Sequence, residues 1–256
     1  ANTTGSSLTA VGNNSLYANT TASYNTAIGK NALLSTTTGS YNTAVGYQAL
    51  DAVTDSELNT GIGVSALGGV TTGDFNLGIG SDTGNYTVIL TTGSRNMCFG
   101  SYAHTSAADS GNQHVFGYNV VGAGDSTFTF GYTTTDSSIA FGATSITAPS
   151  DVRLKEDIQD EVVGLDFINE LRPVTFRWKK EKDIPEELSA YKADSEERTM
   201  NGKYNHGFIA QEVKEVIDNH PEIKEGFDMW TEDEKDGRQR VGASALEIVL
   251  VKAIQE

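Results

Sequence analysis

The stretch that decides the fold is Asn42-Thr43-Ala44-Val45-Gly46-Tyr47-Gln48-Ala49-Leu50, because near-copies of it recur every 17 residues. Its glycine has counterparts at that spacing, each preceded by an apolar residue: Gly12, Gly29, Gly46, Gly63 and Gly80. A second apolar position follows the first four glycines by four residues: Leu16, Leu33, Leu50 and Leu67. A fixed short period indicates stacked units that bury their apolar edges against their neighbours.

The composition of each unit favours β-structure. Seventeen residues cannot hold two helices, and Thr, Val, Ile and Tyr mixed with Gly are typical of strands and tight turns. We therefore predict a β-roll with two short strands per coil, in which Gly and Asn take the corners that need positive φ. The predicted interior has two facing stacks, Ile28, Val45, Ile62 and Ile79 in one and Leu33, Leu50 and Leu67 in the other. The small residues of the repeat are expected where neighbouring chains approach: Ala27, Ala44, Gly61 and Gly78.

These repeats resemble the head repeats of trimeric autotransporter adhesins and similar repeats in phage tail fibres. The resemblance covers residues 8–100 and implies a homotrimeric, shaft-like β-roll. Low-complexity disorder is the alternative that Gly, Ser and Thr content alone would permit. Disorder gives no reason for apolar residues to keep register over five units, so we predict the ordered shaft over residues 1–100.

Residues 101–149 are less regular, and the glycine period drifts to Gly100, Gly117, Gly131 and Gly142. Larger apolar residues such as Phe116, Phe130 and Phe141 predict shortened strands in an irregular stretch of the same β fibre. His104 and His114 fall in this stretch, and packing or solvent exposure is expected for both in preference to a metal or ligand role.

The charge distribution excludes several classes of partner. The formal net charge is −16, of which −6 falls in residues 1–149 and −10 in residues 150–256. Phosphate binding needs clustered Lys and Arg, so neither nucleic acid nor an anionic membrane is expected as a partner. No apolar run approaches the ~20 residues that span a bilayer, and no signal peptide opens the chain.

Two further observations concern cysteine and the chain ends. The lone Cys98 rules out an intrachain disulfide and a Cys-based zinc cluster, and we expect it to be a small buried hydrophobic residue. The sequence begins at Ala1 without Met and ends inside a helical pattern, so a segment of a longer protein is expected.

After Lys155 the pattern changes to that of a small α+β domain ending in a long helix. Apolar spacing predicts helices over 162–171, 211–217 and 245–256, and strands over 174–178, 204–210 and 238–241. The acidic stretch 179–202 is expected to be a loop or a mobile insertion. The last helix carries a heptad-like stripe that suits a bundle with partner chains: Leu246, Val249, Leu250 and Ile254.

This region resembles the intramolecular chaperone domain at the C-terminus of phage tailspikes and tail fibres, the endosialidase-type or peptidase S74 family. The resemblance rests on four motifs in order, at residues 150–155, 171–178, 206–212 and 250–256. It implies a trimeric domain over residues 150–256 that nucleates assembly of the upstream β fibre and is released by self-cleavage.

The resemblance also places a Ser–Lys dyad at the junction, with Ser150 as nucleophile and Lys155 as base. A serine hydroxyl needs a base to take its proton, and a lysine can serve once burial favours its neutral form. The resemblance implies a cut between Ser150 and Asp151, whereas spacing alone leaves the Pro149–Ser150 bond open. Arg153 and His206 are candidate supporting residues, with a structural ion pair of Asp151 and Arg153 and a fold-stabilising hydrogen bond of His206 as the alternatives.

Such a cut is one event per chain, so a single-turnover Ser–Lys endopeptidase with no cofactor and no resident metal is expected. The run Glu232–Gly237 lacks the alternating ligands of a calcium-binding EF-hand, and a solvated turn is predicted there.

The function expected from these features is that of a homotrimeric phage tail fibre segment for host attachment. Its partners would be copies of itself, other virion tail proteins and a host cell-surface receptor, with a glycan as one candidate. It would be made in the host cytoplasm and reside in the virion tail. A glycan-degrading tailspike is an alternative, but it needs paired carboxylates, and the eight acidic residues before Pro149 are scattered. A bacterial trimeric surface adhesin is another.

Overall fold

The computed structural model describes residues 2–223, 227–233, 236–242 and 244–256. The chain divides into two compact units, Ala1–Lys155 and Glu156–Glu256. Each unit has its own hydrophobic core. No helix among the described residues is both long and apolar enough to cross a bilayer.

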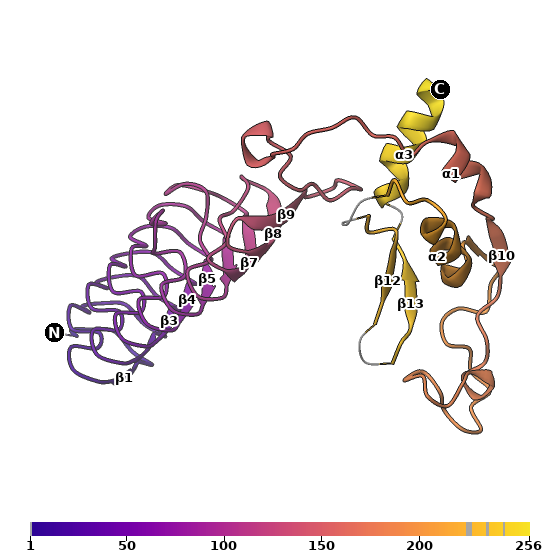
Figure 1. The fold of residues 1–256 in the computed structure, drawn as a ribbon. Coiled ribbons are helices and arrows are strands. Elements are labelled where there is room, and N and C mark those ends of the chain that lie inside the picture. The colour runs from indigo at the N-terminus through magenta and orange to yellow at the C-terminus, as the bar shows by residue number, and fades with distance from the viewer. Residues whose placement is uncertain (1, 224–226, 234–235, 243) are drawn as a thin grey trace. The chain divides into compact units, whose positions relative to one another are not determined.

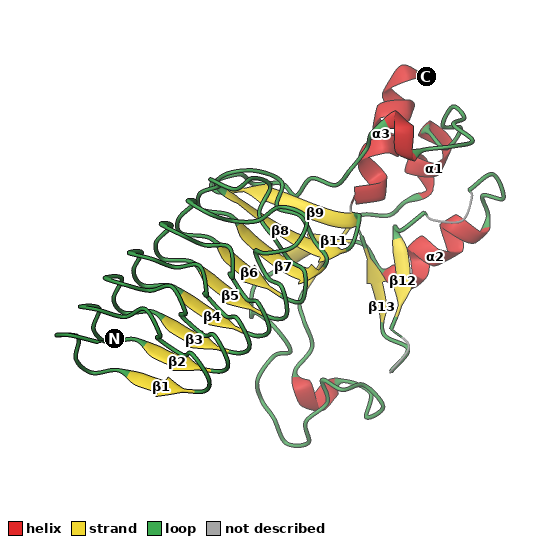
Figure 2. Ribbon diagram, turned by 90° about the vertical axis from the view of Figure 1, so that its left-hand side faces the viewer, coloured by secondary structure: helices red, strands yellow, loops and turns green. Residues whose placement is uncertain are grey.

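The first unit is a β-solenoid of about seven turns, as the 17-residue period predicts. Its strands form one nine-stranded sheet in chain order along one side of the solenoid (Figures 1 and 2). The first eight strands are parallel, in steps such as Thr26 to Thr43, and only the last pair is antiparallel. The strands are β1 (Thr9–Val11), β2 (Thr26–Ile28), β3 (Thr43–Val45), β4 (Thr60–Ile62), β5 (Leu77–Ile79), β6 (Met97–Phe99), β7 (His114–Tyr118), β8 (Thr127–Tyr132) and β9 (Thr135–Ala140).

Each regular coil contains one strand, so the prediction of two strands per coil is wrong. The other sides of a coil are turns in which Asn31 and Leu33 have φ of 61° and 50°. A positive φ costs conformational energy in residues other than glycine and turns the chain out of an extended run. Hydrogen bonds from neighbouring coils to these turn residues offset that cost. The Leu33 amide, for example, donates to the Ala49 carbonyl at 3.1 Å.

The solenoid interior confirms one predicted stack and corrects the other. Leu33, Leu50 and Leu67 are fully buried, as expected. The residues facing them are the small ones, Ala27, Ala44, Gly61 and Gly78, whereas Ile28 and Ile62 are 40% and 39% exposed. A Cβ added at Gly61 would lie 3.0 Å from Leu50 Cγ, so the space opposite the leucines admits only small side chains. Both the interior isoleucine stack and the outward alanine and glycine positions were therefore predicted wrongly.

A ladder of buried asparagines runs along the solenoid. The Asn42 amide N–H donates to Asn25 Oδ1 at 2.8 Å, and Asn42 Nδ2 donates to the Ser56 carbonyl at 2.8 Å. Asn59, Asn76 and Asn96 repeat this arrangement, and Asn25, the first of the five buried members, accepts from Asn42 and donates its Nδ2 to the Gly39 carbonyl. These asparagines were expected at corners, but the positive φ falls one residue earlier, at Tyr24. Asn14 and Asn31 do take corners.

The last coils carry aromatic packing. Phe99 and Phe116 stack with ring centroids 4.8 Å apart, and His114 packs edge-on against Phe141. His104 is buried, with its Nε2 2.8 Å from Thr87 Oγ1 and its Nδ1 3.0 Å from the Thr105 carbonyl. Both histidines thus have packing roles. Cys98 is buried as predicted, and this burial raises the pKa of its thiol to about 12.

The second unit is the predicted small α+β fold. Its elements are α1 (Leu165–Glu170), β10 (Val174–Phe176), the short 3-10 helix η2 (Glu181–Asp183), β11 (Asn205–Gly207), α2 (Ala210–Asp218), β12 (Trp230–Glu232), β13 (Gln239–Val241) and α3 (Ser244–Gln255). β10 pairs with β11, and β12 pairs with β13, both antiparallel. The core is centred on five buried side chains: Val163, Phe167, Val213, Met229 and Val249.

The apolar stripe predicted for α3 is only partly buried by its own unit. Val249 is buried in the core, whereas Leu250 and Ile254 are 44% and 84% exposed. A second exposed row adds Ile248 and Val251. The helix therefore uses one side for its own unit and leaves other apolar side chains outside.

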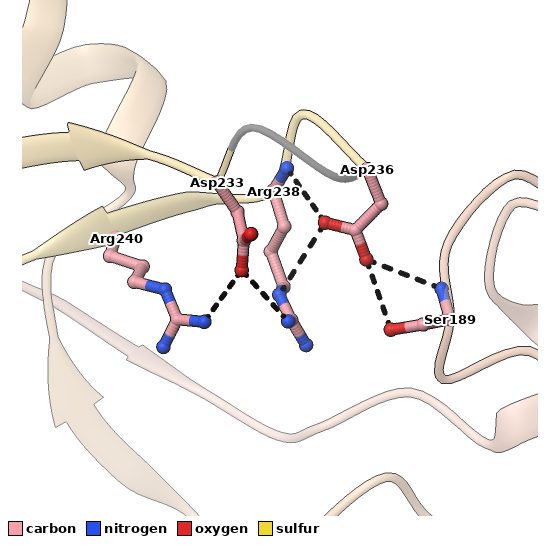
Figure 3. Close-up of polar contacts among 5 residues, drawn as sticks. All are labelled: Ser189, Asp233, Asp236, Arg238 and Arg240. Atoms are coloured by element: carbon pink, nitrogen blue, oxygen red, sulfur yellow. Dashed lines mark hydrogen bonds and ion pairs between the residues drawn. The ribbon is translucent and has the colours of Figure 1, made fainter.

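The predicted loop 179–202 is organised by contacts. Glu196 pairs with Lys180 and Lys182, and Glu181 pairs with Lys192. The loop also reaches the β12–β13 turn, where Ser189 Oγ donates to Asp236 Oδ2 at 3.0 Å (Figure 3). Asp233 accepts from the guanidinium groups of Arg238 and Arg240 in the same cluster. Instead of being simply solvated, these carboxylates have protein partners; Glu234 and Lys235 of that predicted turn lie outside the described residues.

Candidate functional site

The candidate site is the exposed segment that follows the solenoid. After β9, Ser138 and Thr147 exchange two backbone hydrogen bonds of 2.7 Å, which tie the segment back to the sheet. Ser150 comes three residues later and is exposed. Both predicted dyad residues belong to the first unit, which ends at Lys155.

A single turn brings the dyad together. Val152–Leu154 form a 3-10 helix, in which the Leu154 amide donates to the Asp151 carbonyl at 3.0 Å. The turn returns the chain, so that Lys155 Nζ donates to Ser150 Oγ at 2.8 Å. The structure thus places the predicted nucleophile and base in direct contact, which the five-residue spacing alone could not establish.

Asp151 and Arg153 stabilise this turn. Asp151 caps the 3-10 helix, because its Oδ1 accepts from the Arg153 backbone amide at 2.9 Å and from Arg153 Nε at 3.0 Å. The Arg153 side chain, and next its backbone amide, lower the pKa of the Asp151 carboxyl. The pair is a local ion pair that also stabilises the turn between Ser150 and Lys155, and a supporting role of Arg153 in cleavage stays a prediction.

His206 lies on β11 in the second unit, where its backbone is paired with Thr175 and its side chain is exposed. Another polar pair in this unit was missed from the sequence: Arg172 Nε donates to Glu212 Oε2 at 3.0 Å. They line an open cavity of about 360 Å³ between the end of α1 and α2. Both residues fall within the quoted motifs, but 40 residues separate them and only the fold brings them together.

The chemistry open to the dyad is acyl transfer at a peptide bond. A serine oxygen that loses its proton to a neutral lysine amine attacks a carbonyl carbon, and water then releases the acyl group. Ser150 and Lys155 are both exposed in this chain. Within the described ranges, no group of three or more His, Cys, Asp or Glu side chains is placed to hold a metal.

The comparisons with known proteins bear on the same segment. The family model described as the chaperone of endosialidase (Peptidase_S74) matches residues 150–220. Neither the curated proteins nor the solved structures gave a match. The matched segment begins at Ser150 and includes Lys155, Arg153 and His206. The chain therefore joins a β-solenoid to a segment that matches the chaperone of endosialidase family.

Proposed function

We propose that this chain is part of a homotrimeric phage tail fibre for host attachment, and that residues 150–256 nucleate its trimerisation and then separate by self-cleavage at Ser150. The observation that carries the proposal is the Lys155 Nζ to Ser150 Oγ contact of 2.8 Å, at the first residue of the family match and directly after the solenoid. Host receptor and virion proteins would be the partners of the fibre, with a glycan as one candidate receptor.

Folding kinetics give the chaperone its role. Coils stacked from three chains need aligned registers before any coil is stable, and such non-local contacts form slowly. A separately folding domain that trimerises raises the effective concentration of the three solenoid ends and fixes their register. Coils can then add by nearest-neighbour stacking, and a later cut leaves the fibre kinetically trapped.

Timing of the cut follows from exposure of the dyad. Burial favours the neutral form of a lysine, which is the form that can take a serine proton, and assembly with neighbouring copies would bury the exposed dyad. We therefore expect cleavage only in the assembled state.

Ring size bears on which bond is cut. Attack by Ser150 Oγ on its own carbonyl carbon would close a strained four-membered ring, whereas attack on the Pro149 carbonyl carbon closes a five-membered one. The expected cut between Ser150 and Asp151 thus calls for a hydroxyl from another copy. A cut before Ser150 could take place within one chain.

Intact mass tests the proposal. Wild type is expected to give two fragments whose masses place the new N-terminus at Asp151, and Ser150→Ala and Lys155→Ala are expected to stay whole. Arg177→Ala, a substitution outside the turn, serves as the control and should be cut like wild type. If wild type and both dyad variants run as the same unbroken species, the self-cleavage proposal is wrong. If light scattering shows a monomer, the proposal of a trimeric fibre is wrong as well.

A further inference from the structure

The outer face of the solenoid sheet carries one apolar column along its whole length, beside a row that begins with Thr9, Thr26, Thr43 and Thr60. Strand side chains alternate between the two faces, so the residue after each small interior one points outward. In register these outward residues form what we term the outer column: Val11, Ile28, Val45, Ile62, Ile79, Phe99, Phe116 and Phe130. Every member is apolar, and none is buried in the chain.

Two flanking columns widen this face: Tyr24, Tyr41, Leu58, Phe75 and Arg95 before the strands, and Lys30, Tyr47 and Val64 after them. On one side Tyr24 and Tyr41 stack with ring centroids 4.9 Å apart, and Phe75 is 54% exposed. On the other side Tyr47 and Val64 are 44% and 48% exposed. Single exposed apolar residues are ordinary, but contiguous rows of them mark interaction surfaces.

The charges of the face favour a second copy of this chain as the occupant. Residues 1–149 carry eight acidic residues, and none of them lies in the outer column or the flanking columns. The only two basic residues of this region, Lys30 and Arg95, lie in the flanking columns. Two such regions, each with a net charge of −6, repel one another, and their approach costs least over columns without carboxylates.

The period of the face points to the same occupant. One outer-column side chain appears per coil, at the spacing of adjacent strands, about 4.8 Å. A partner that matches these side chains one for one over eight strands needs the same rise per unit, and another copy of this solenoid has it. We propose that the outer column and its flanking columns are the surface through which copies of this chain associate, parallel and in register. The inference rests on the proposed homotrimer and names its interface.

Disulfide trapping tests the assignment. The full chain is made with Cys98→Ala, since alanine fits the equivalent interior position at Ala44, and then carries either Ile62→Cys or Thr72→Cys. Ile62 lies in the outer column, and Thr72 is exposed on a turn of the same coil, before β5 begins. Mild oxidation is expected to give covalent dimers on non-reducing gels for Ile62→Cys only.

The outcomes separate the two proposals. A chain that associates by light scattering but links at Thr72→Cys, or at neither site, overturns the interface and leaves the trimer standing. The same holds if the associated chain does not link and still binds an apolar dye, because the copies would then associate while leaving this face open. A monomeric chain overturns both.

A charge variant gives a second readout. Ile62→Asp is expected to weaken association at least tenfold, whereas Thr72→Asp leaves it unchanged. Far-UV circular dichroism checks that both variants fold. Equal association of the two folded variants would overturn the interface.

Discussion

Asn59 illustrates how one side chain connects three coils. Its Oδ1 accepts from the Asn76 amide at 2.9 Å, and its Nδ2 donates to the Gly73 carbonyl at 2.9 Å, while its own amide donates to Asn42 Oδ1 at 3.0 Å. All three asparagines are buried, so no water is at hand to replace a lost partner. Buried backbone groups left unpaired cost about 1–3 kcal/mol each.

Asn59→Ala is therefore expected to destabilise the solenoid by roughly 2–4 kcal/mol, because it strands the Asn76 amide and the Gly73 carbonyl. Alkylation of Cys98 in rising urea measures this, since the buried thiol reacts only when the solenoid opens. Asn13→Ala, at an exposed asparagine, is the matched control. Equal protection of Cys98 in the two variants would show that the ladder contributes nothing.

Asp151 offers a prediction in pH. Its pKa is lowered in the folded chain, so the ion pair with Arg153 contributes fully above the ordinary aspartate range and is lost as the pH falls through the lowered pKa. In Arg153→Gln the pKa of Asp151 should rise toward that of a free aspartate, as carboxyl NMR titration would show. Arg177→Gln should leave it unchanged. An Asp151 pKa that is the same with and without Arg153 would contradict the capping role.

Prediction of single residues from the sequence succeeded where the repeat period alone decides which positions are buried. It failed where the result depends on which face of the strand a side chain occupies. Leu33 was placed inside correctly because an apolar residue recurs at its position in four successive repeats. Ala27 and Ile28 were exchanged, because hydrophobicity favours the isoleucine inside whereas a thin coil has room only for the alanine. Hydrophobicity measures the gain from burial and does not measure the space available.

At the scale of elements, α1 anchors the second unit through one side chain. Phe167 is fully buried, and the rings of His220 and Phe227 meet it edge-on at 5.3 and 5.6 Å. Leu165 lies on the same helix and is 43% exposed. Substitutions at Phe167 and Leu165 therefore distinguish the contribution of core packing from that of the helix itself.

Phe167→Ala is expected to cost the second unit about 3–5 kcal/mol, the usual penalty for removing a buried phenylalanine. Tryptophan fluorescence in urea reports this unit alone, since both tryptophans, Trp178 and Trp230, lie within it. Leu165→Ala should shift the midpoint far less. Under the proposed function, Phe167→Ala also lowers the yield of associated chain, and an unchanged yield with a destabilised second unit would argue against nucleation.

Element prediction was best for the helices and weakest for the turns. The helix predicted over 211–217 is α2, which apolar spacing and the following Pro221 mark, and that over 245–256 is α3, which apolar spacing alone marks. The 3-10 turn at Val152–Leu154 was not predicted, since its stability comes from the Asp151 cap and not from a periodic pattern. That turn decides whether Ser150 and Lys155 meet, so the dyad could be named from the sequence but its contact could not.

At the scale of the whole molecule, the coil is the smallest segment that can be removed from the solenoid without shifting the register of the remaining strands. Each coil bonds only to its neighbours through contacts 17 residues apart, so removing one complete coil leaves all remaining pairs in register. Deleting residues 47–63 joins Gly46 to Val64 and restores the repeat. Deleting residues 47–62 shifts every later side chain by one position.

The 17-residue deletion is therefore expected to fold and to keep Cys98 protected from alkylation, whereas the 16-residue deletion exposes Cys98 without urea. Comparison of labelling rates in the two deletions and the full chain checks this. Equal protection in both deletions would mean that the register is not set by the coil.

The antiparallel turn-back of β9 gives the solenoid a direction. Its reversal ends the parallel ladder, and the Ser138–Thr147 bonds occupy part of the strand's remaining edge. A coil placed after β9 would find no free parallel strand edge to pair with. A coil inserted among the parallel strands before β9 would pair with a parallel strand on each side. The solenoid can therefore be lengthened or shortened by whole coils, in steps of one strand spacing, while β9 remains its last strand. Through every such change the Ser150–Lys155 pair keeps the same distance from the last coil.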